Sequence, residues 1–330
     1  MVDNPIEFPA PTIHRGRTTL LRLQSGDSFQ ECPGVLSESG MVYELGQVLK
    51  DAIYGEVLVG VILQEMGAGT GMYQRSDALV AVKKVSHAKM MALGDTFEDP
   101  MKEIAALQLL GSSHINIIQM YECIYDDVDH YTIMEFCSTG CFSDLLMLHK
   151  KFTELQAQTY FRHAVQGVQH MHTCGVCHRD LSLQNLVLSS EGFCKIIDFG
   201  MALRVPHMET SEGLAALLMP PQGACGKENY MAPEVILNNA PIDGFKVDIW
   251  ALGIILFAFL VGRPPMRFAS TGDTFYCHIR DGRLTALIRY WKLDLSQGAI
   301  NFLQRLIQPD PERRLTLAEI LTDPWMTEAL

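Results

Sequence analysis

The sequence predicts an α+β protein with two lobes, a small antiparallel β-sheet lobe that carries one helix and a larger, mostly α-helical lobe. Three observations predict this class. The chain has 330 residues, too many for one small domain and a suitable number for two lobes that share a cleft. Hydrophobic residues make up 48% of it, which supports a sizeable core and excludes a mainly disordered chain. Strand-like runs precede Cys137, and helical periodicity follows it.

Charge and cysteine content narrow the function classes. Lys and Arg number 26 and Asp and Glu number 38, so the net charge is −12, and we expect no nucleic-acid partner and no membrane attachment. The first residues lack the basic and apolar segments of a signal peptide. We therefore expect free thiols in a reducing compartment, the cytoplasm or the nucleus. The apolar run over residues 249–262 is too short to cross a bilayer and is interpreted as a buried core helix.

Residues 1–40 mix Pro, Thr, Arg and Ser without a clear period, so we expect a loosely ordered N-terminal extension. The strand-rich lobe follows over residues 41–137. Its runs of β-branched and aromatic residues predict a small antiparallel sheet. The predicted strands cover residues 42–49, 55–63, 79–85, 116–125 and 130–136.

One predicted helix interrupts these strands over residues 98–110. Ile104, Leu107 and Leu110 share one helical face, and the acidic pair and proline at its start suit the positive end of a helix dipole. Residues 138–330 form the predicted helical lobe. Helical spacing of apolar residues covers 142–152, 155–172, 247–262 and 299–307.

Several polar residues in apolar surroundings indicate phosphoryl transfer. Asp180, Asn185 and Asp198 adjoin apolar β-like runs, so we expect them on loops at strand ends. Their oxygens suit Mg²⁺, which usually bridges substrate phosphates. Lys83 lies inside an apolar strand, where a cation is costly unless it is paired, and Glu103 is the expected partner. The alternative for these two residues is a plain surface ion pair.

These residues carry a resemblance to the catalytic domain of eukaryotic protein kinases of the Ser/Thr type, over about residues 43–325. The resemblance implies the bilobal protein-kinase fold, with ATP and Mg²⁺ used to phosphorylate a protein substrate. The matching motifs stand in the family's order. They are VAVK at 80–83 with Glu103, HRDL at 178–181 with Asn185, DFG at 198–200, APE at 232–234, DIW at 248–250 with Gly253, and Arg314, where the family pairs an Arg with the APE glutamate.

The resemblance also implies a role for each site residue. Asp180 would accept or orient the proton of the substrate hydroxyl. Lys83 would hold the ATP phosphates, with Glu103 fixing its position. Asn185 and Asp198 would bind Mg²⁺. The other residues expected to contact ATP are Leu49, Lys50, Ala52 and Gly55 at the phosphate loop, Met134, Glu135 and Cys137 at the adenine hinge, and Val57, Ala81 and Val187 around the ring.

The phosphate loop departs from the family pattern. The glycine-rich run at 67–71 has the wrong spacing and lies too close to the VAVK strand, so it is interpreted as an inserted, exposed β-turn. Residues 49–57 align better, although Lys50 and Ala52 replace the first two glycines and only Gly55 remains. Glycine lets backbone N–H groups approach phosphate, so we expect measurable ATP binding with a raised KM.

Two positions beside the catalytic aspartate also depart from the pattern. Ser/Thr-directed members usually have Lys two residues after this Asp and Thr shortly before the APE triplet, where this chain has Ser182 and Lys227. We hypothesise that the hydroxyl and the ammonium have exchanged places. Lys227 would then supply the cation beside the transferring phosphate, as a catalytic residue. The alternative is that Lys227 points into solvent.

Neighbouring positions bear on the substrate class. Tyrosine-directed members have Arg two or four residues after the catalytic Asp, and Ser182 and Gln184 stand there, which favours Ser/Thr specificity. Arg-directed members have Glu at the positions of Gln184 and Cys141. Both carboxylates are missing here, so we expect no Arg-directed consensus.

Arg179 precedes the catalytic Asp, and in the family this Arg often pairs with a phosphate on the activation segment, which by the resemblance covers residues 198–234 here. The candidate phosphorylation sites here are Thr210 and Ser211. The run CGVCH at 174–178 also fits haem-attachment and redox patterns. Its His belongs to the catalytic loop, so we expect neither haem nor zinc.

The expected function is transfer of the γ-phosphoryl group of ATP to a Ser or Thr hydroxyl of a protein, with Asp180 as catalytic base. One alternative is a pseudokinase scaffold with weak or no catalysis. The atypical phosphate loop, Ser182 and Lys227 favour it, whereas the presence of Lys83, Asp180 and Asp198 opposes it. A second alternative is a small-molecule phosphotransferase, a class that generally lacks the APE and DIW motifs.

Overall fold

The computed structural model describes residues 2–25, 28–94, 96–210 and 213–328. Internal contacts divide the chain into two compact units. The barrel unit comprises Ala10–Ser113 and Ile118–Cys137, and the helical unit comprises Met1–Pro9, His114–Ile117 and Ser138–Leu330. The antiparallel sheet of the first unit and the helices of the second confirm the expected α+β class.

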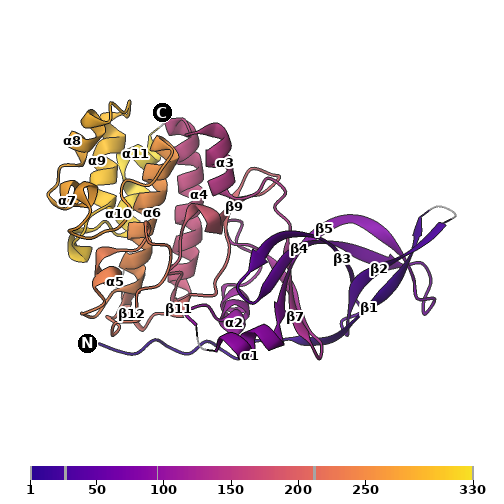
Figure 1. Cartoon of the computed structure of the whole chain (residues 1–330). Helices are drawn as coiled ribbons and strands as arrows, with labels where there is room; N and C mark the ends of the chain where they lie inside the picture. Colours follow the sequence, from indigo (N-terminus) through magenta and orange to yellow (C-terminus); the bar gives the residue numbers. More distant parts are fainter. Residues whose placement is uncertain (1, 26–27, 95, 211–212, 329–330) are drawn as a thin grey trace. The chain divides into compact units, whose positions relative to one another are not determined.

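Seven strands of the barrel unit form one closed sheet in the order β1-β2-β3-β4-β5-β7-β6 (Figure 1). The neighbours in this order are antiparallel, and the barrel closes where β1 runs parallel to β6, pairing His14 with Ile124 and Arg15 with Tyr125. The bounds are β1 (His14–Ser25), β2 (Ser28–Ser37), β3 (Val42–Ala52), β4 (Gly55–Glu65), β5 (Met72–Ser86), β6 (Met120–Tyr125) and β7 (Asp129–Glu135).

The strands β3 to β7 confirm the five strands predicted from the sequence. Their bounds differ most at β5, which begins at Met72 rather than at residue 79, and β6 begins at Met120 rather than at residue 116. Ile117 instead forms an isolated bridge with Ile196 inside the helical unit. The apolar run that starts at residue 116 therefore contributes to two different sheets. The sequence pattern alone does not show where one contribution ends and the other begins.

The N-terminal segment differs from its expectation, because residues 14–25 and 28–37 pair as antiparallel strands of a β-hairpin rather than forming a loosely ordered extension. The strand β2 also continues the sheet onto β3. The hairpin contributes to the core, since Leu21 and Leu23 are only 3% and 1% exposed. These leucines alternate with polar residues over a short distance only, so the local pattern does not predict a strand. In the structure, β1 pairs with β2 along most of its length and also pairs with the distant strands β5 and β6.

Two buried clusters fill the interior of the barrel unit. One contains Leu21, Leu23, Cys32, Val42, Leu63 and Tyr73. The other contains Val35, Tyr43, Leu58, Val80, Val82, Ile124, Tyr131 and Ile133. Each cluster combines side chains of the N-terminal hairpin with side chains of β3 to β7, so the hairpin and the sheet share one core.

Replacing Leu23 with alanine tests whether the hairpin belongs to the fold. Because Leu23 is buried beside Val42, Leu63 and Tyr73, we expect the free energy of unfolding in urea to fall by about 2–5 kcal/mol. Leu20→Ala, at a position 65% exposed on the same strand, is the matched control and should change it by less than about 0.5 kcal/mol. Small and equal effects of the two substitutions would contradict the closed barrel.

Two helices belong to the barrel unit, α1 (His87–Leu93) and α2 (Pro100–Leu110). The second confirms the helix predicted over residues 98–110, and the side chain of Asp99 caps it by accepting from two backbone N–H groups. Gln108 on α2 exchanges two hydrogen bonds with the backbone of Thr12, at 2.8 and 2.7 Å. The N-terminal segment therefore contacts the helix that carries Glu103.

The helical unit is built around α6 (Gly244–Val261), which packs against α4 (Glu154–Thr173). The helix α6 is long and apolar enough to span a bilayer, but 83% of this stretch is buried inside the protein, as expected for a core helix. The other helices are α3 (Phe142–His149), α5 (Pro233–Leu237), α7 (Thr274–Arg280), α8 (Leu284–Tyr290), α9 (Gln297–Leu306), α10 (Leu317–Thr322) and α11 (Pro324–Thr327), with the 3₁₀ turns η1 (Leu183–Asn185) and η2 (Pro311–Arg313).

Short strand pairs carry the loops of the helical unit. The pairs are β8 (Val176–Cys177) with β11 (Leu203–Arg204), β9 (Leu186–Leu188) with β10 (Cys194–Ile196), and β12 (His207–Thr210) with β13 (Gly213–Ala216). The first two pairs fix the ends of the segments that hold Asp180, Asn185 and Asp198. Asp180 and Asp198 lie on loops next to strands, as the sequence predicts, and Asn185 ends the 3₁₀ turn η1 immediately before β9.

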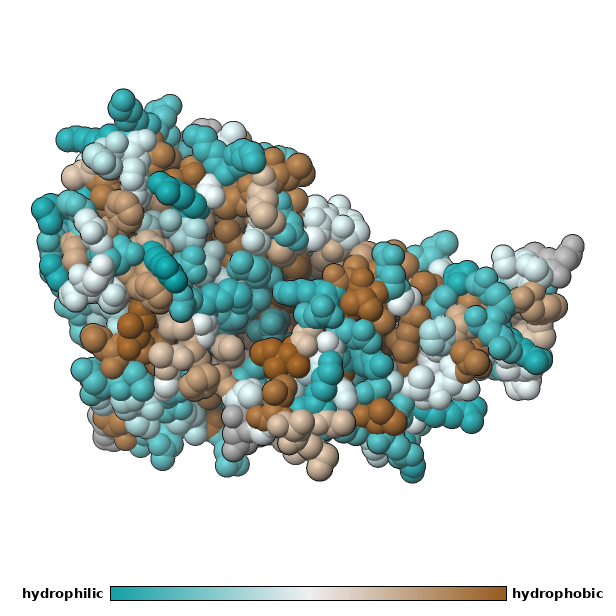
Figure 2. All heavy atoms as spheres, viewed as in Figure 1, coloured by the Kyte–Doolittle hydropathy of each residue, from teal (hydrophilic) through white to brown (hydrophobic). Residues whose placement is uncertain are grey.

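The visible surface mixes apolar and polar side chains over both units (Figure 2). In the barrel unit, Val48, Leu49 and Ile53 are about half exposed, at 51%, 46% and 52%. Val48 and Leu49 lie in β3, and Ile53 lies in the turn that joins β3 and β4. The β3–β4 hairpin therefore presents apolar side chains to solvent.

Candidate active site

Strand pairing brings four of the expected ATP-binding residues to one face of the barrel sheet. Val57 on β4 lies opposite Lys83 on β5, and Ala81 on β5 lies opposite Met134 on β7. Directly opposed residues, and residues two apart along a strand, point to the same side of a sheet. This face therefore presents apolar side chains next to a single ammonium group.

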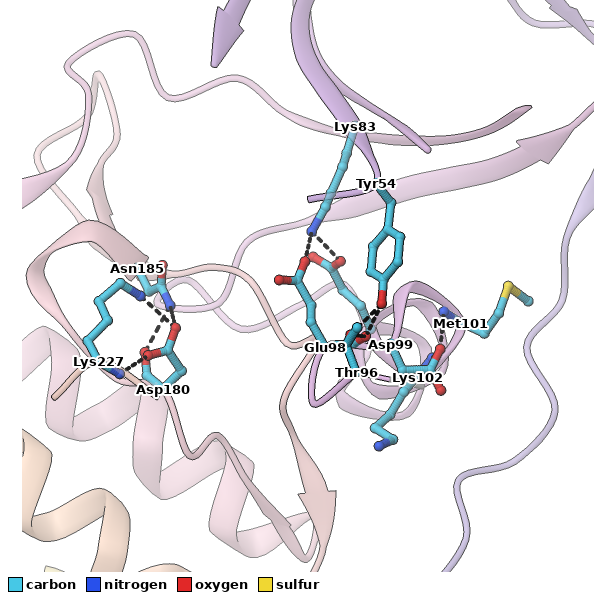
Figure 3. A network of polar contacts seen from close by, with 11 residues as sticks. Tyr54, Lys83, Thr96, Glu98, Asp99, Met101, Lys102, Asp180, Asn185 and Lys227 are labelled. Atoms are coloured by element: carbon cyan, nitrogen blue, oxygen red, sulfur yellow. Dashed lines mark hydrogen bonds and ion pairs between the residues drawn. The ribbon is translucent and has the colours of Figure 1, made fainter. Parts of the chain in front are cut away.

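Two carboxylates hold the ammonium group of Lys83 (Figure 3). Its Nζ lies 2.6 Å from Glu103 Oε2 and 3.7 Å from Glu98 Oε1. Lys83 and Glu103 are 7% and 4% exposed, which excludes the alternative of a surface ion pair. Buried charges are stable only when they are paired, so Glu103 fixes where the Lys83 ammonium lies.

A contact that the sequence analysis missed joins the β3–β4 turn to the same network. Tyr54 in this turn is 4% exposed, and its hydroxyl contacts Thr96 Oγ1 and donates to the carbonyl oxygen of Glu98 at 2.9 Å. Glu98 therefore contacts both Tyr54 and Lys83. Because Glu98 also suits a helix start, the local pattern does not reveal its second role.

The expected phosphate loop is the turn between β3 and β4 with the flanking strand ends. Lys50 is exposed at the end of β3, and Ala52 lies opposite Gly55 across the hairpin. A Cβ atom on Gly55 would lie 1.9 Å from the carbonyl oxygen of Lys84. The close approach of β5 therefore requires glycine at this position, a packing reason that the sequence does not reveal.

The glycine-rich run at 67–71 lies in the exposed connection between β4 and β5, where a turn insertion is expected. The backbone N–H and the hydroxyl of Thr70 both donate to the carbonyl oxygen of Gly67, at 3.0 and 2.9 Å. This turn is separate from the β3–β4 hairpin.

In the helical unit, the carboxylate of Asp248 on α6 orders the loop that carries Asp180. It accepts hydrogen bonds from the backbone N–H groups of His178 and Arg179, at 2.9 and 3.0 Å, and lies 3.0 Å from His172 Nε2. Asp248 is fully buried. Because a buried carboxylate needs hydrogen-bond partners, these contacts hold the loop backbone in one conformation.

The carboxylate of Asp180 is the centre of a second cluster (Figure 3). Asn185 Nδ2 donates to its Oδ2 at 2.7 Å. Lys227 donates twice, through its backbone N–H to Oδ1 at 3.0 Å and through Nζ to Oδ2 at 2.6 Å. The Lys227 side chain is 34% exposed, but its ammonium group is bound. The alternative in which Lys227 points into solvent is therefore wrong.

The structure shows only half of the proposed exchange between Ser182 and Lys227. Ser182 is fully buried, and its hydroxyl has no hydrogen-bond partner among the described residues. The ammonium group of Lys227 contacts Asp180, whereas the hydroxyl of Ser182 does not. The cation beside Asp180 is therefore Lys227 of the activation segment, and the hydroxyl of Ser182 makes no corresponding contact.

Asn185 and Asp198 offer the oxygen donors that suit Mg²⁺. The amide nitrogen of Asn185 is used by Asp180, which leaves its Oδ1 as a ligand. The backbone N–H of Ile197 donates to the carbonyl oxygen of Asn185 at 3.0 Å, so the two expected ligands belong to adjoining segments. This donor chemistry fits a Mg²⁺ site that takes its remaining ligands from water and phosphate.

The remaining ATP-binding candidates divide between the two units. Glu135 ends β7, and its backbone N–H donates to the carbonyl oxygen of Gln119 at 2.9 Å. Cys137 is the last residue of the barrel unit. Val187 belongs to the helical unit, where it is 9% exposed and forms an isolated antiparallel β-bridge with Cys141.

The activation segment contacts Arg179 through its backbone. The guanidinium donates to the carbonyl oxygens of Met201 and Gln222, at 3.5 and 3.2 Å, so it joins two separate parts of the segment. The candidate phosphorylation site Thr210 is exposed at the end of β12. The other candidate, Ser211, lies outside the described residues.

Both cysteines of the CGVCH run are shielded by burial. Cys174 and Cys177 are both free thiols. Burial raises the pKa of both thiols, and most strongly that of the fully buried Cys177. Reactive cysteines need a lowered pKa, so Cys177 is best described as a small apolar core residue.

Arg314 and the APE glutamate Glu234 form the pair that the motif predicts. Their atoms lie 2.8 and 3.1 Å apart in a bidentate contact. Arg314 is 2% exposed and lies over the Trp250 ring at 5.2 Å from its centre. The end of the activation segment is thus attached to the core of the helical unit.

Comparison with known proteins gives one family. The family model described as "Protein kinase domain" matches residues 65–326. The chain is 29% identical to CBL-interacting protein kinase 9 of Oryza sativa subsp. japonica, over 86% of this chain and 56% of the relative. It is 32% identical to CBL-interacting serine/threonine-protein kinase 15 of Arabidopsis thaliana, over 76% and 55%. The chain thus spans about half the length of these relatives.

Proposed function

Because this chain belongs to the protein kinase family, we propose that it is a serine/threonine protein kinase that transfers the γ-phosphoryl group of ATP to a protein hydroxyl. The observation that carries this proposal is the Asp180 cluster, a buried carboxylate held by Asn185 and Lys227. Similarity to curated serine/threonine-protein kinases supports the acceptor class.

In this proposal, Asp180 receives the proton of the substrate hydroxyl as the oxygen attacks the γ-phosphorus. Its two oxygens already accept three hydrogen bonds, which orient the carboxylate and leave capacity for one more. Lys83 binds the phosphates of ATP, and Glu103 keeps its ammonium group in place. The apolar face around Val57 and Ala81 would receive the adenine ring.

Protein kinases use Mg²⁺ to neutralise charge on the phosphates. Asn185 and Asp198 would hold this ion. The amide nitrogen of Asn185 bonds Asp180 while its oxygen is left for the ion, so one side chain would link the base and the metal. The reducing compartment expected from the thiols is part of the same proposal.

A second candidate function is a pseudokinase scaffold, and one observation favours it. The ammonium group of Lys227 lies 2.6 Å from Asp180 Oδ2 and so occupies a carboxylate oxygen that a substrate hydroxyl would approach. Against it, Lys83 and Glu103 form the ion pair that phosphate binding requires.

Nucleotide binding and phosphoryl transfer separate the two candidates. A thermal-shift titration of the chain with ATP and Mg²⁺ measures binding, and incubation with [γ-³²P]ATP and a generic protein substrate measures transfer. The kinase predicts a thermal shift together with label on serine or threonine. A shift without label on any protein would support the scaffold instead.

Substitution of Lys227 tests its catalytic role. We expect Lys227→Ala to lower kcat about 10²-fold, as for loss of one donor to the reacting oxygens, with little change in the KM for ATP. Lys227→Arg keeps the charge and should retain a larger share of kcat. A near-normal kcat in Lys227→Ala would contradict the role.

A further inference from the structure

A groove of about 620 Å³ opens in the helical unit next to the loop of Asp180. Its walls come from the end of α3, from η1, from the activation segment before the APE triplet and from the turn that follows α6. Gln184 and Lys227 line it, and Lys227 also bonds the carboxylate of Asp180. A peptide in this groove would therefore pass close to the catalytic carboxylate.

The lining of this groove is positively charged. Lys150, Lys227 and Arg263 contribute three cations, and no Asp or Glu belongs to the lining among the described residues. The neighbouring acids Asp144 and Glu228 lie outside it. The whole chain has a net charge of −12, so the charge of the groove is opposite in sign to that of the protein as a whole.

Two of these cations have no counter-ion. Lys150 and Arg263 are exposed, and neither forms an ion pair within the described part of the chain. Arg263 stacks on Trp291, with its guanidinium carbon 5.2 Å from the ring centre, which leaves its donors available. The groove thus offers one ammonium and one guanidinium group to a ligand.

Close backbone packing joins the segments that carry the two cations. Gly262 has a φ of +95°, and a Cβ atom there would lie 2.2 Å from the carbonyl oxygen of Lys150. The backbone N–H of Phe152 donates to the carbonyl oxygen of Phe259 at 2.9 Å and joins the same two segments. Like charges that the fold holds together attract an anion, because an anion relieves their repulsion.

We propose that this groove selects protein substrates whose phosphorylated hydroxyl is flanked by acidic side chains. The inference rests on the proposed kinase function and names its substrate class. Gln184 and Cys141 are neutral where Arg-directed kinases have glutamate, which agrees with it. A basic substrate segment would meet Lys150 and Arg263 and be repelled.

Kinetics with matched peptides test the proposal. Three serine peptides differ only in their flanks, which are acidic, neutral or basic. We expect the wild-type chain to have a kcat/KM at least about tenfold higher for the acidic than for the basic peptide, and added salt to reduce this ratio. The double variant Lys150→Glu, Arg263→Glu should invert this ratio and leave the kcat/KM for the neutral peptide unchanged.

A charge-matched control separates the groove from general electrostatics. Lys89→Glu, Arg313→Glu carries the same change in net charge at two exposed positions outside the groove, and should keep the wild-type ratio. Equal kcat/KM for the acidic and basic peptides in the wild type would overturn the proposal, and so would inversion in the control.

Direct binding makes the two levels of the proposal distinguishable. Fluorescence anisotropy of the labelled acidic peptide needs no catalysis, and we expect the affinity to fall at least about tenfold in the groove variant but not in the control. Binding of this kind without phosphorylation of any peptide would refute the kinase function and retain the groove. Phosphorylation that ignores charge would retain the kinase and refute the groove.

Discussion

Replacing Asp180 with asparagine is expected to lower the rate of phosphoryl transfer by about 10²–10⁴-fold, the usual contribution of a general base. The amide is nearly the same shape but cannot take the proton of the attacking hydroxyl. Its oxygen can still accept from one of the donors that surround Asp180, so the loop held by Asp248 should keep its conformation. The measurement is transfer from [γ-³²P]ATP to a protein substrate.

Nucleotide binding provides the second readout for this variant. Lys83 and Glu103 belong to the other unit and are untouched, so the thermal shift with Mg²⁺ and ATP should persist. Asp294→Asn, the same chemical change at an exposed position, is the control and should keep wild-type transfer. Transfer that survives Asp180→Asn would remove Asp180 from the mechanism.

Replacing Arg314 with alanine is expected to lower the free energy of unfolding of the helical unit by about 3–5 kcal/mol, because it leaves a partly buried carboxylate without its cation. Arg314 donates to Glu234 at 2.8 and 3.1 Å and to the carbonyl oxygens of Lys246 and Gln308 at 2.6 and 2.9 Å. Each acceptor would lose its charged donor at once.

The neighbouring residue gives a matched control for this variant. Arg313 is exposed and forms no ion pair among the described residues, so Arg313→Ala should change the free energy of unfolding by less than about 0.5 kcal/mol. Denaturation in urea, followed by tryptophan fluorescence, to which the buried Trp250 contributes, measures both. A loss below about 1 kcal/mol for Arg314→Ala would show that Glu234 finds other partners.

The elements that the sequence predicts well are those with a clear local period. The strands β3 to β7 and the helices α2, α4 and α6 each carry a pattern of apolar residues that is readable within one segment. The hairpin of β1 and β2 was missed because β1 also pairs with β5 and β6, which are distant in sequence. The burial of Leu21 and Leu23 follows from that pairing and cannot be predicted from the residues around them.

The contacts of the site also divide into those that the sequence predicts and those that it does not. The contacts Lys83–Glu103 and Arg314–Glu234 follow from recognised motifs, and both are present. The contact between Tyr54 and Glu98 was missed, because it joins a turn to a helix start that each look complete on their own. The reason for Gly55 was also incomplete, since the approach of β5 depends on strand register.

Closure of the barrel bears on how this protein associates with other chains. An open sheet leaves a row of backbone N–H and C=O groups at its margin, to which a foreign strand can be added. Here β2 occupies the margin of β3, and β1 occupies part of the margin of β6. For a strand of another polypeptide to pair along these rows, the β1–β2 hairpin would first have to detach from β3 and β6. Because the hairpin covers these rows, it also protects the sheet against aggregation.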